Sequence, residues 1–271
     1  MPRKKVNKQN ARLPSNRALV LLFVSIALFT HVSISLHEHS QLAYWVSHTK
    51  PIFSRFKVKS VIANDQKERK DQSVRILSDD PMIRVYPHFI TAKESKQLIA
   101  LAKSRLEASK VMRGNQAVLD DKIRSSKTAY LSRSDSHIVA AIEDRICKIV
   151  ACEVHQIEPL QVVHYSKGQF YKPHHDYLEP GDFEPTLGQR LHTFLIYLNN
   201  VAPSDGGLTF FPQLNISIQP EMGAALYFRN LDIHGNPDPR TLHAGEEIFN
   251  PQIEKWAINV WIREKTFSKP E

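Results

Sequence analysis

Residues 164–176 read His-Tyr-Ser-Lys-Gly-Gln-Phe-Tyr-Lys-Pro-His-His-Asp, and the end of this stretch is the most informative part of the sequence. Alternate residues of an extended strand project to the same face, so His174 and Asp176 can bind one metal ion while His175 points away. A further histidine, His243, follows 67 residues after Asp176. The sequence therefore predicts a metal centre of two histidines and one carboxylate, at which two distant segments meet.

This ligand set leaves coordination positions of the metal open to other molecules. Two histidines and one carboxylate are typical of non-haem Fe(II) oxygenases, although the same side chains also suit zinc. Lys255 lies twelve residues after His243, and an ammonium group there can bind the far carboxylate of 2-oxoglutarate while this cosubstrate chelates the iron. The residues predict an Fe(II) site with 2-oxoglutarate as cosubstrate, with a zinc site as the alternative.

Further motifs occur before and after this stretch in a definite order. With them, the chain closely resembles the prolyl 4-hydroxylase branch of the 2-oxoglutarate and Fe(II)-dependent dioxygenases, from about residue 80 to 264. The motifs that carry the resemblance are residues 83–90, 124–126, 164–176, 188–190, 206–212, 240–245 and 255–256.

The resemblance implies roles for six residues around the metal. The implied iron ligands are His174, Asp176 and His243, and the implied partners of the distal carboxylate of 2-oxoglutarate are Lys255, Tyr165 and Thr209. Lys255 would supply the positive charge, and the two hydroxyl groups would donate hydrogen bonds. The metal ligands are expected to converge inside the open end of the core.

The resemblance also implies a substrate groove. Tyr171, Arg190 and Trp261 match positions that line the peptide groove of the plant and algal enzymes. Arg263 departs from those enzymes, which tend to have histidine two residues after the groove tryptophan. This difference concerns the identity of the substrate more than the chemistry.

The function implied by the resemblance is that of an enzyme which hydroxylates peptidyl proline, like procollagen-proline 4-dioxygenases, and converts 2-oxoglutarate to succinate and CO2. The implied cofactors are Fe(II), 2-oxoglutarate, O2 and ascorbate. The alternatives are hydroxylation of a free amino acid or other small substrate, dealkylation of nucleic acid, and a non-catalytic jelly-roll binding domain. The complete set of metal ligands, together with Lys255, favours an enzyme.

The pattern of apolar residues predicts an α+β fold. A capping box at residues 91–94 announces a helix from about 92 to 107, and an apolar stripe from Ile138 to Val150 predicts a second helix that starts after Ser134 or Asp135. Short apolar runs then predict strands at residues 160–165, 191–198, 208–211, 216–218, 224–228 and 256–262. We expect a double-stranded β-helix, or jelly roll, with the helices packed on it.

The N-terminal part predicts a membrane anchor. A basic arm at residues 1–17 precedes an uncharged run at residues 18–36, which is just long enough to span a bilayer as a helix. A cleaved signal peptide ending near residues 33–35, or a peripheral helix, is the alternative. Residues 37–74 are expected to form a stem, and residues 75–266 the dioxygenase domain.

Basic residues before the run favour an N-inside, type II orientation. The catalytic domain would then face the lumen of the endoplasmic reticulum or Golgi, or lie at the inner membrane if the host is bacterial. Residues 1–17 contain six basic side chains and no acidic one, so they account for most of the net charge of +8. The modest charge of the remainder disfavours a nucleic-acid partner, and a proline-containing protein or peptide is the expected substrate.

The two cysteines, Cys147 and Cys152, are predicted to be buried free thiols. Both fall within the second helical pattern, where residues i and i+5 lie on different sides of a helix. A disulfide between them is therefore not expected.

Overall fold

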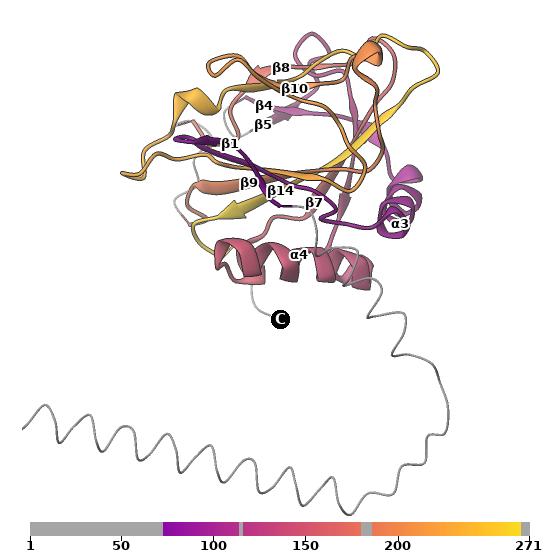
Figure 1. Ribbon diagram of the computed structural model, residues 1–271. Helices are drawn as coiled ribbons and strands as arrows, with labels where there is room; N and C mark the ends of the chain where they lie inside the picture. The colour runs from indigo at the N-terminus through magenta and orange to yellow at the C-terminus, as the bar shows by residue number, and fades with distance from the viewer. Residues whose placement is uncertain (1–72, 114–115, 180–185, 267–271) are drawn as a thin grey trace, which may run out of the picture. The chain divides into compact units, whose positions relative to one another are not determined.

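The structure is a computed structural model, and it describes residues 73–113, 116–179 and 186–266. The described chain is mostly β-structure with two longer helices (Figure 1). The fold contains both helices and strands, as the predicted α+β class requires, but sheets make up most of it. These sheets form a jelly-roll-like sandwich.

The larger sheet has eight strands, and its antiparallel pairing joins segments from both ends of the domain. In spatial order these strands are β1 (Arg75–Asp79), β2 (Met82–Tyr86), β12 (Ala225–Arg229), β9 (Arg190–Tyr197), β14 (Lys255–Arg263), β7 (Leu160–Tyr165), β6 (Lys127–Leu131) and β3 (Glu107–Ala108). Each of the six strands predicted after residue 158 is present, with no bound shifted by more than one residue.

The smaller sheet has four strands and carries part of the metal-binding motif. Its order is β11 (Ile216–Ile218), β10 (Thr209–Phe211), β13 (His243–Gly245) and β8 (Tyr171–His174). A separate hairpin consists of β4 (Val111–Arg113) and β5 (Gln116–Val118). The described residues also contain four short 3-10 helices: η2 (Arg133–Asp135), η3 (Val154–Gln156), η4 (Pro203–Asp205) and η5 (Pro239–Thr241).

Alternating side chains of the larger sheet divide the hydrophobic core into two layers. On β9, Phe194 and Ile196 belong to the cluster beneath the helices, whereas Leu195 and Tyr197 belong to the cluster between the two sheets. This period of two is expected for a strand that is buried on both faces. The larger sheet therefore forms the middle layer, between the helices and the smaller sheet.

Helix α3 (Ala92–Lys103) starts with the predicted capping box, in which Thr91 and Glu94 exchange side-chain hydrogen bonds with each other's backbone N–H groups. It ends at Lys103 rather than at residue 107, because Glu107 and Ala108 pair with β6 as strand β3. Helix α4 (His137–Val150) starts at the N-cap Ser136 and lies against the larger sheet (Figure 1). Of the predicted apolar stripe, Ile138, Val139, Ile142 and Ile146 are buried in the core, whereas Ile149 is exposed.

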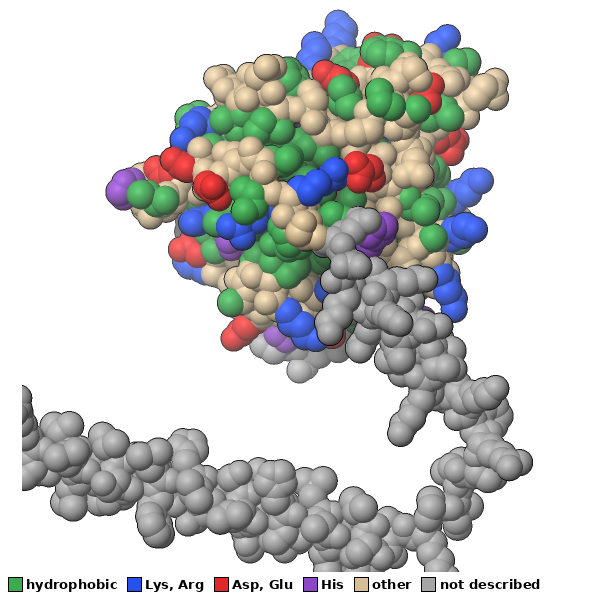
Figure 2. All heavy atoms as spheres, in the orientation of Figure 1, with side chains coloured by type: hydrophobic (Ala, Val, Ile, Leu, Met, Phe, Trp, Pro, Cys, Tyr) green, Lys and Arg blue, Asp and Glu red, His purple; other side chains and the backbone are tan. Residues whose placement is uncertain are grey.

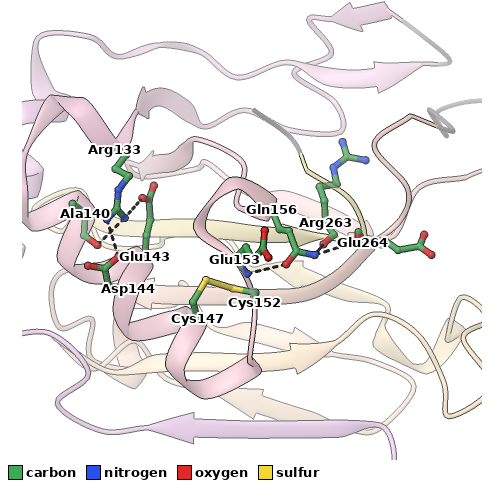
Figure 3. Close-up of a disulfide and its surroundings, with 10 residues drawn as sticks. All are labelled: Arg133, Ala140, Glu143, Asp144, Cys147, Cys152, Glu153, Gln156, Arg263 and Glu264. Carbon is green, nitrogen blue, oxygen red and sulfur yellow. Dashed lines mark hydrogen bonds and ion pairs between the residues drawn. A yellow bond between two sulfur atoms is a disulfide. The ribbon is translucent and has the colours of Figure 1, made fainter. Parts of the chain in front are cut away.

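The prediction of two free thiols is wrong, because Cys147 and Cys152 form a disulfide (Figure 3). The prediction assumed a helix that continues through residue 152, but α4 ends at Val150 and Ala151 is left-handed, with φ 54° and ψ 49°. This turn brings Cys152 back to the last helical turn, where its backbone N–H donates to the carbonyl of Cys147 at 3.3 Å. The two Cα atoms are only 4.5 Å apart.

The predicted basic arm and membrane-spanning segment, residues 1–36, lie outside the described residues, and so does the predicted stem apart from residues 73 and 74. Within the described ranges, no helix combines the length and the apolar character that crossing a bilayer requires. Acidic and basic side chains are interspersed over the face of the domain seen in Figure 2.

Candidate active site and metal centre

Three potential metal ligands meet at one end of the smaller sheet. His174 ends β8 and pairs directly with His243, which begins β13, while Asp176 lies in the bend just after β8. Nε2 of His174 is 3.8 Å from Oδ1 of Asp176, and Nε2 of His243 is 3.7 Å from Oδ2. The ligand atoms of all three lie within 4.8 Å of one another, so these side chains could hold one metal ion.

Each of these three side chains is oriented by a hydrogen bond to a residue outside the cluster. Nδ1 of His174 lies 2.8 Å from the carbonyl of Lys172, and Nδ1 of His243 lies 3.0 Å from that of Thr241, so each Nδ1 carries the proton. Such contacts fix the tautomer and leave Nε2 for a metal. The Thr193 hydroxyl donates to Asp176 at 2.9 Å.

The electrostatics of the cluster suit metal binding. Burial, followed by the nearby His243, lowers the pKa of His174 well below its usual value. Burial alone would raise the pKa of Asp176, but His243 and His174 outweigh it, and the pKa is lowered. The neutral imidazole and the ionised carboxylate are the forms that a metal requires.

His175 takes no part in this group. Its ring stacks on Tyr177 with centroids 4.3 Å apart, and Nε2 lies 3.2 Å from the carbonyl of Pro239. The strand ends at His174, so Asp176 reaches the cluster from a bend rather than from the extended strand that the sequence predicted.

A second feature of the site is a buried amine. Lys255 is 3% exposed and faces Tyr165, its cross-strand partner on β7. Its Nζ lies 5.4 Å from the ring centre of Tyr165 and 6.0 Å from that of Tyr197. Burial lowers the pKa of Lys255 to about 7, against a small opposing effect of Glu246.

No carboxylate of the described residues lies within ion-pair distance of Lys255. Thr209 lies close by, since its hydroxyl accepts a hydrogen bond from the Tyr197 hydroxyl at 2.9 Å. At Gly207, φ is +69° and a Cβ atom would clash with the Ile248 side chain, so a larger residue is strained at this position beside Lys255. A buried ammonium group needs an anion to offset its desolvation, and this pocket could receive one.

A cavity of about 800 Å³ opens beside the metal-binding residues. Of the predicted groove residues, Tyr171, Arg190 and Trp261 line it, whereas Arg263 lies behind its wall. The Tyr171 ring stacks on His174 at a centroid distance of 3.5 Å. Elsewhere in the cavity lining, the Arg190 guanidinium lies 3.8 Å from the ring centre of Trp261.

The wall also contains residues to which the sequence analysis gave no role. Glu158 is 7% exposed and accepts hydrogen bonds from both Arg190 and Arg263. Arg124 is 5% exposed and lies 4.7 Å from the Tyr171 ring centre. Arg124 falls in a motif that carried the family resemblance, but Glu158 is an ordinary surface-type residue in the sequence, and only the sheet pairing brings it to the wall.

Comparison with known proteins gives a consistent result. Residues 160–263 match the 2OG-Fe(II) oxygenase superfamily. The chain is 33% identical to prolyl 4-hydroxylase 1 of Arabidopsis thaliana over 71% of this chain and 72% of that protein. It is also 33% identical to prolyl 4-hydroxylase 2 of the same plant, over 72% of each chain.

A solved structure agrees with these relatives. The viral collagen prolyl hydroxylase of Paramecium Bursaria Chlorella virus-1, determined as a 2OG complex, is 26% identical with a TM-score of 0.56. The alignment covers 69% of this chain and 98% of that one.

Proposed function

The chain belongs to the prolyl 4-hydroxylase family of 2OG-Fe(II) oxygenases, and from this premise we propose that it hydroxylates prolyl residues of a protein or peptide. The reaction converts 2-oxoglutarate to succinate and CO2. The observation that carries the proposal is the cluster of two histidines and one carboxylate, in the same domain as a buried lysine that has no counter-ion among the described residues.

His174, Asp176 and His243 would hold Fe(II). The donor set fits this metal, since two imidazoles and one carboxylate leave open positions for other ligands. Bound Fe(II) would supply the activation of O2 and the oxidative decarboxylation. The protein holds the three ligands in position through Lys172, Thr241 and Thr193, as their hydrogen bonds indicate.

Lys255 would bind the distal carboxylate of 2-oxoglutarate, with Tyr165 and Thr209 as hydrogen-bond partners. The support is the burial of all three side chains and the lowered pKa of Lys255, which an anion would raise again. The dicarboxylate would thereby restore the charge of the amine.

Tyr171, Arg190 and Trp261 would hold the peptide directly, and Arg263 would act from behind the wall through its hydrogen bond to Glu158. Tyr171 and Trp261 supply flat apolar surfaces of the kind that receive proline-rich segments, and Arg190 supplies hydrogen-bond donors. The substrate would also cover the metal-binding residues and exclude water from the reacting C–H bond. O2 is the oxidising cosubstrate in this proposal, and ascorbate the reductant that keeps the iron ferrous.

We further propose that residues 18–36 anchor the protein in a membrane with N-inside orientation, and that residues 75–266 act in an oxidising lumen. The disulfide between Cys147 and Cys152 supports this location, because disulfides persist in oxidising compartments and are rare in the cytosol. At a bacterial inner membrane the same orientation would place the domain in the periplasm.

The function can be tested with the full chain purified in mild detergent. The protein is incubated with Fe(II), ascorbate, 2-oxoglutarate and a library of proline-rich peptides, and the peptides are analysed by mass spectrometry. We expect one added oxygen on proline, with equimolar succinate, and neither product with the Asp176→Asn variant. Hydroxylation of free proline without any peptide product would favour the small-substrate alternative instead.

A further inference from the structure

The buried amine of Lys255 stands at the start of β14, where the strand is paired with a neighbouring strand on one side only. Against β7, pairing begins at Lys255 itself, which lies opposite Tyr165. Against β9, pairing begins two residues later, at Ala257, which lies opposite the last residue of that strand, Tyr197. The backbone around Lys255 therefore extends past the end of β9, and its N–H and C=O groups on that side need other partners.

The side chain of Asn199 supplies these partners. Its Oδ1 accepts a hydrogen bond from the backbone N–H of Trp256 at 2.7 Å, and its Nδ2 donates to the carbonyl of Glu254 at 2.7 Å. A third hydrogen bond, from Nδ2 to the carbonyl of Asn200 at 3.1 Å, holds the amide against its own turn. The reversed amide would place N–H against N–H and oxygen against oxygen, so the contacts themselves fix its orientation. Asn199 thus continues the ladder of β9 and binds the backbone on both sides of Lys255.

The two neighbours of Lys255 are held on the other face of the sheet. Trp256 belongs to the core cluster beneath the helices, and its ring centre lies 4.3 Å from that of His164. Its indole Nε1 donates to the Glu254 carboxylate at 3.0 Å, and that carboxylate lies 3.3 Å from Nε2 of His164. Lys255 points the opposite way, toward Tyr165 in the cluster between the two sheets. The backbone of residues 254–256 therefore sets the direction in which the lysine leaves the sheet.

This direction matters because no ion pair holds the end of the lysine side chain. No carboxylate of residues 73–113, 116–179 and 186–266 lies within ion-pair distance of Lys255. A lysine has a long flexible stem, so the position of its ammonium group depends on its Cα atom and on the surrounding packing. Binding groups of this kind require a supporting set of hydrogen bonds to be placed accurately.

We propose that Asn199 is a positioning residue for the cosubstrate, which holds the backbone on both sides of Lys255 so that the ammonium group meets the distal carboxylate of 2-oxoglutarate. This inference rests on the proposed function, in which Lys255 binds that carboxylate. Asn199 itself contacts only the backbone beside Lys255 and that of its own turn. Its loss should therefore change the affinity for 2-oxoglutarate and leave the metal and the peptide unaffected.

The test measures 2-oxoglutarate binding to the full chain in detergent, loaded with Fe(II) and kept under nitrogen, by calorimetry. We expect Asn199→Ala to raise the dissociation constant by about tenfold, the factor that corresponds to about 1.4 kcal/mol. Asn199→Asp should bind at least as weakly, because it keeps the shape and the bond to Trp256 but places a charged oxygen against the carbonyl of Glu254. In the hydroxylation assay, KM for 2-oxoglutarate should rise by the same factor, with kcat, KM for the peptide and iron content unchanged.

Asn200→Ala is the matched control. Its Oδ1 accepts from the backbone N–H of Met222 at 2.7 Å, so this variant also removes a bond from a side chain to the backbone at the same turn, but away from Lys255. It should keep the wild-type constant for 2-oxoglutarate. An unchanged constant in Asn199→Ala, or an equal rise in Asn199→Ala and Asn200→Ala, would overturn the inference.

A double variant shows whether Asn199 acts through the lysine. If it does, Asn199→Ala should weaken binding no further in a protein that already carries Lys255→Ala, because the group that Asn199 positions is gone. Titration to millimolar 2-oxoglutarate compares the single and double variants. A further tenfold loss in the double variant would mean that Asn199 acts elsewhere, and the inference would be wrong.

Failure of the proposed function gives a different result. If no proline peptide is hydroxylated, but Asn199→Ala still weakens 2-oxoglutarate binding through Lys255, then the proposed reaction is wrong and the positioning role stands. If the wild-type protein with Fe(II) does not bind 2-oxoglutarate, then the positioning role is overturned together with the proposed role of Lys255.

Discussion

At the scale of single residues, Lys255 is the side chain whose chemistry depends most on its surroundings. In water its amine would be charged, but in the interior its pKa falls to about 7. The domain therefore maintains a buried cation that is only partly ionised near neutrality. Burying this charged amine costs free energy in the unliganded protein, and a bound anion would offset that cost.

We predict that Lys255→Ala weakens 2-oxoglutarate binding by about two to three decades or more, since breaking a buried charge pair costs roughly 3–5 kcal/mol. Lys255→Arg should be intermediate, because the charge persists but the fork is bulkier and aimed differently. Titration of 2-oxoglutarate against succinate release measures both effects. An unchanged constant in Lys255→Ala would remove this residue from the site, and metal content should stay at the wild-type level.

The same residue predicts a pH dependence. The free amine loses its proton as the pH rises through about 7, whereas a paired ammonium keeps it. Binding of 2-oxoglutarate should thus take up a proton above pH 7, and affinity should fall by at most about tenfold per pH unit there. Calorimetry in buffers of different ionisation enthalpy measures the proton uptake, which Lys255→Met should lack.

The metal ligands can be tested by single substitutions. His174→Ala, Asp176→Ala and His243→Ala should each abolish Fe(II) binding and turnover, whereas His175→Ala should retain the metal because its ring stacks on Tyr177. Metal content of the purified variants provides the measurement. Loss of iron in His175→Ala alone would contradict the assignment.

Much of the candidate site could be predicted from the sequence, because its residues lie in short motifs with definite spacing. The structure brings His174, Asp176 and His243 together, and Tyr165 faces Lys255. Thr193, Tyr197 and Glu158 were not predicted. They act through contacts between strands, and nothing in their own sequence surroundings distinguishes them from other strand and loop residues.

At the scale of elements, the end of α4 was the least predictable part of the fold. Helices often end at a left-handed glycine, which is visible in a sequence, but here the left-handed residue is Ala151. The strands were easier, because their apolar runs are bounded by Gly, Pro, Asn and Asp. The disulfide forms only because α4 ends before Cys152. Placing the end of this helix two residues too late therefore also led to the wrong prediction of free thiols.

We predict that reduction of the disulfide lowers the free energy of unfolding by about 2 kcal/mol, the value that loop-closure entropy gives for so short a loop. Urea unfolding with and without reductant measures the change. The double variant Cys147→Ser/Cys152→Ser should unfold alike under both conditions. Two reactive thiols in the unreduced native protein would show that the bridge does not form.

At the scale of the whole molecule, we predict that the segment before the domain determines its location. Full-length protein should remain in the membrane fraction after alkaline carbonate, because residues 18–36 are long enough to span a bilayer. Deletion of residues 1–40 should release an active, soluble domain. Extraction by carbonate would exclude a spanning helix, and a mature N-terminus near Leu36 would show cleavage of a signal peptide.

The two sheets contribute different parts of the proposed cosubstrate site. His174 and His243 belong to the smaller sheet, and Lys255 to the larger one. A metal-bound dicarboxylate with its far end on Lys255 would therefore fasten the two halves of the sandwich together. Metal and 2-oxoglutarate together would form one link between the two sheets. We therefore expect the rise in melting temperature with both present to exceed the sum of the rises with each alone.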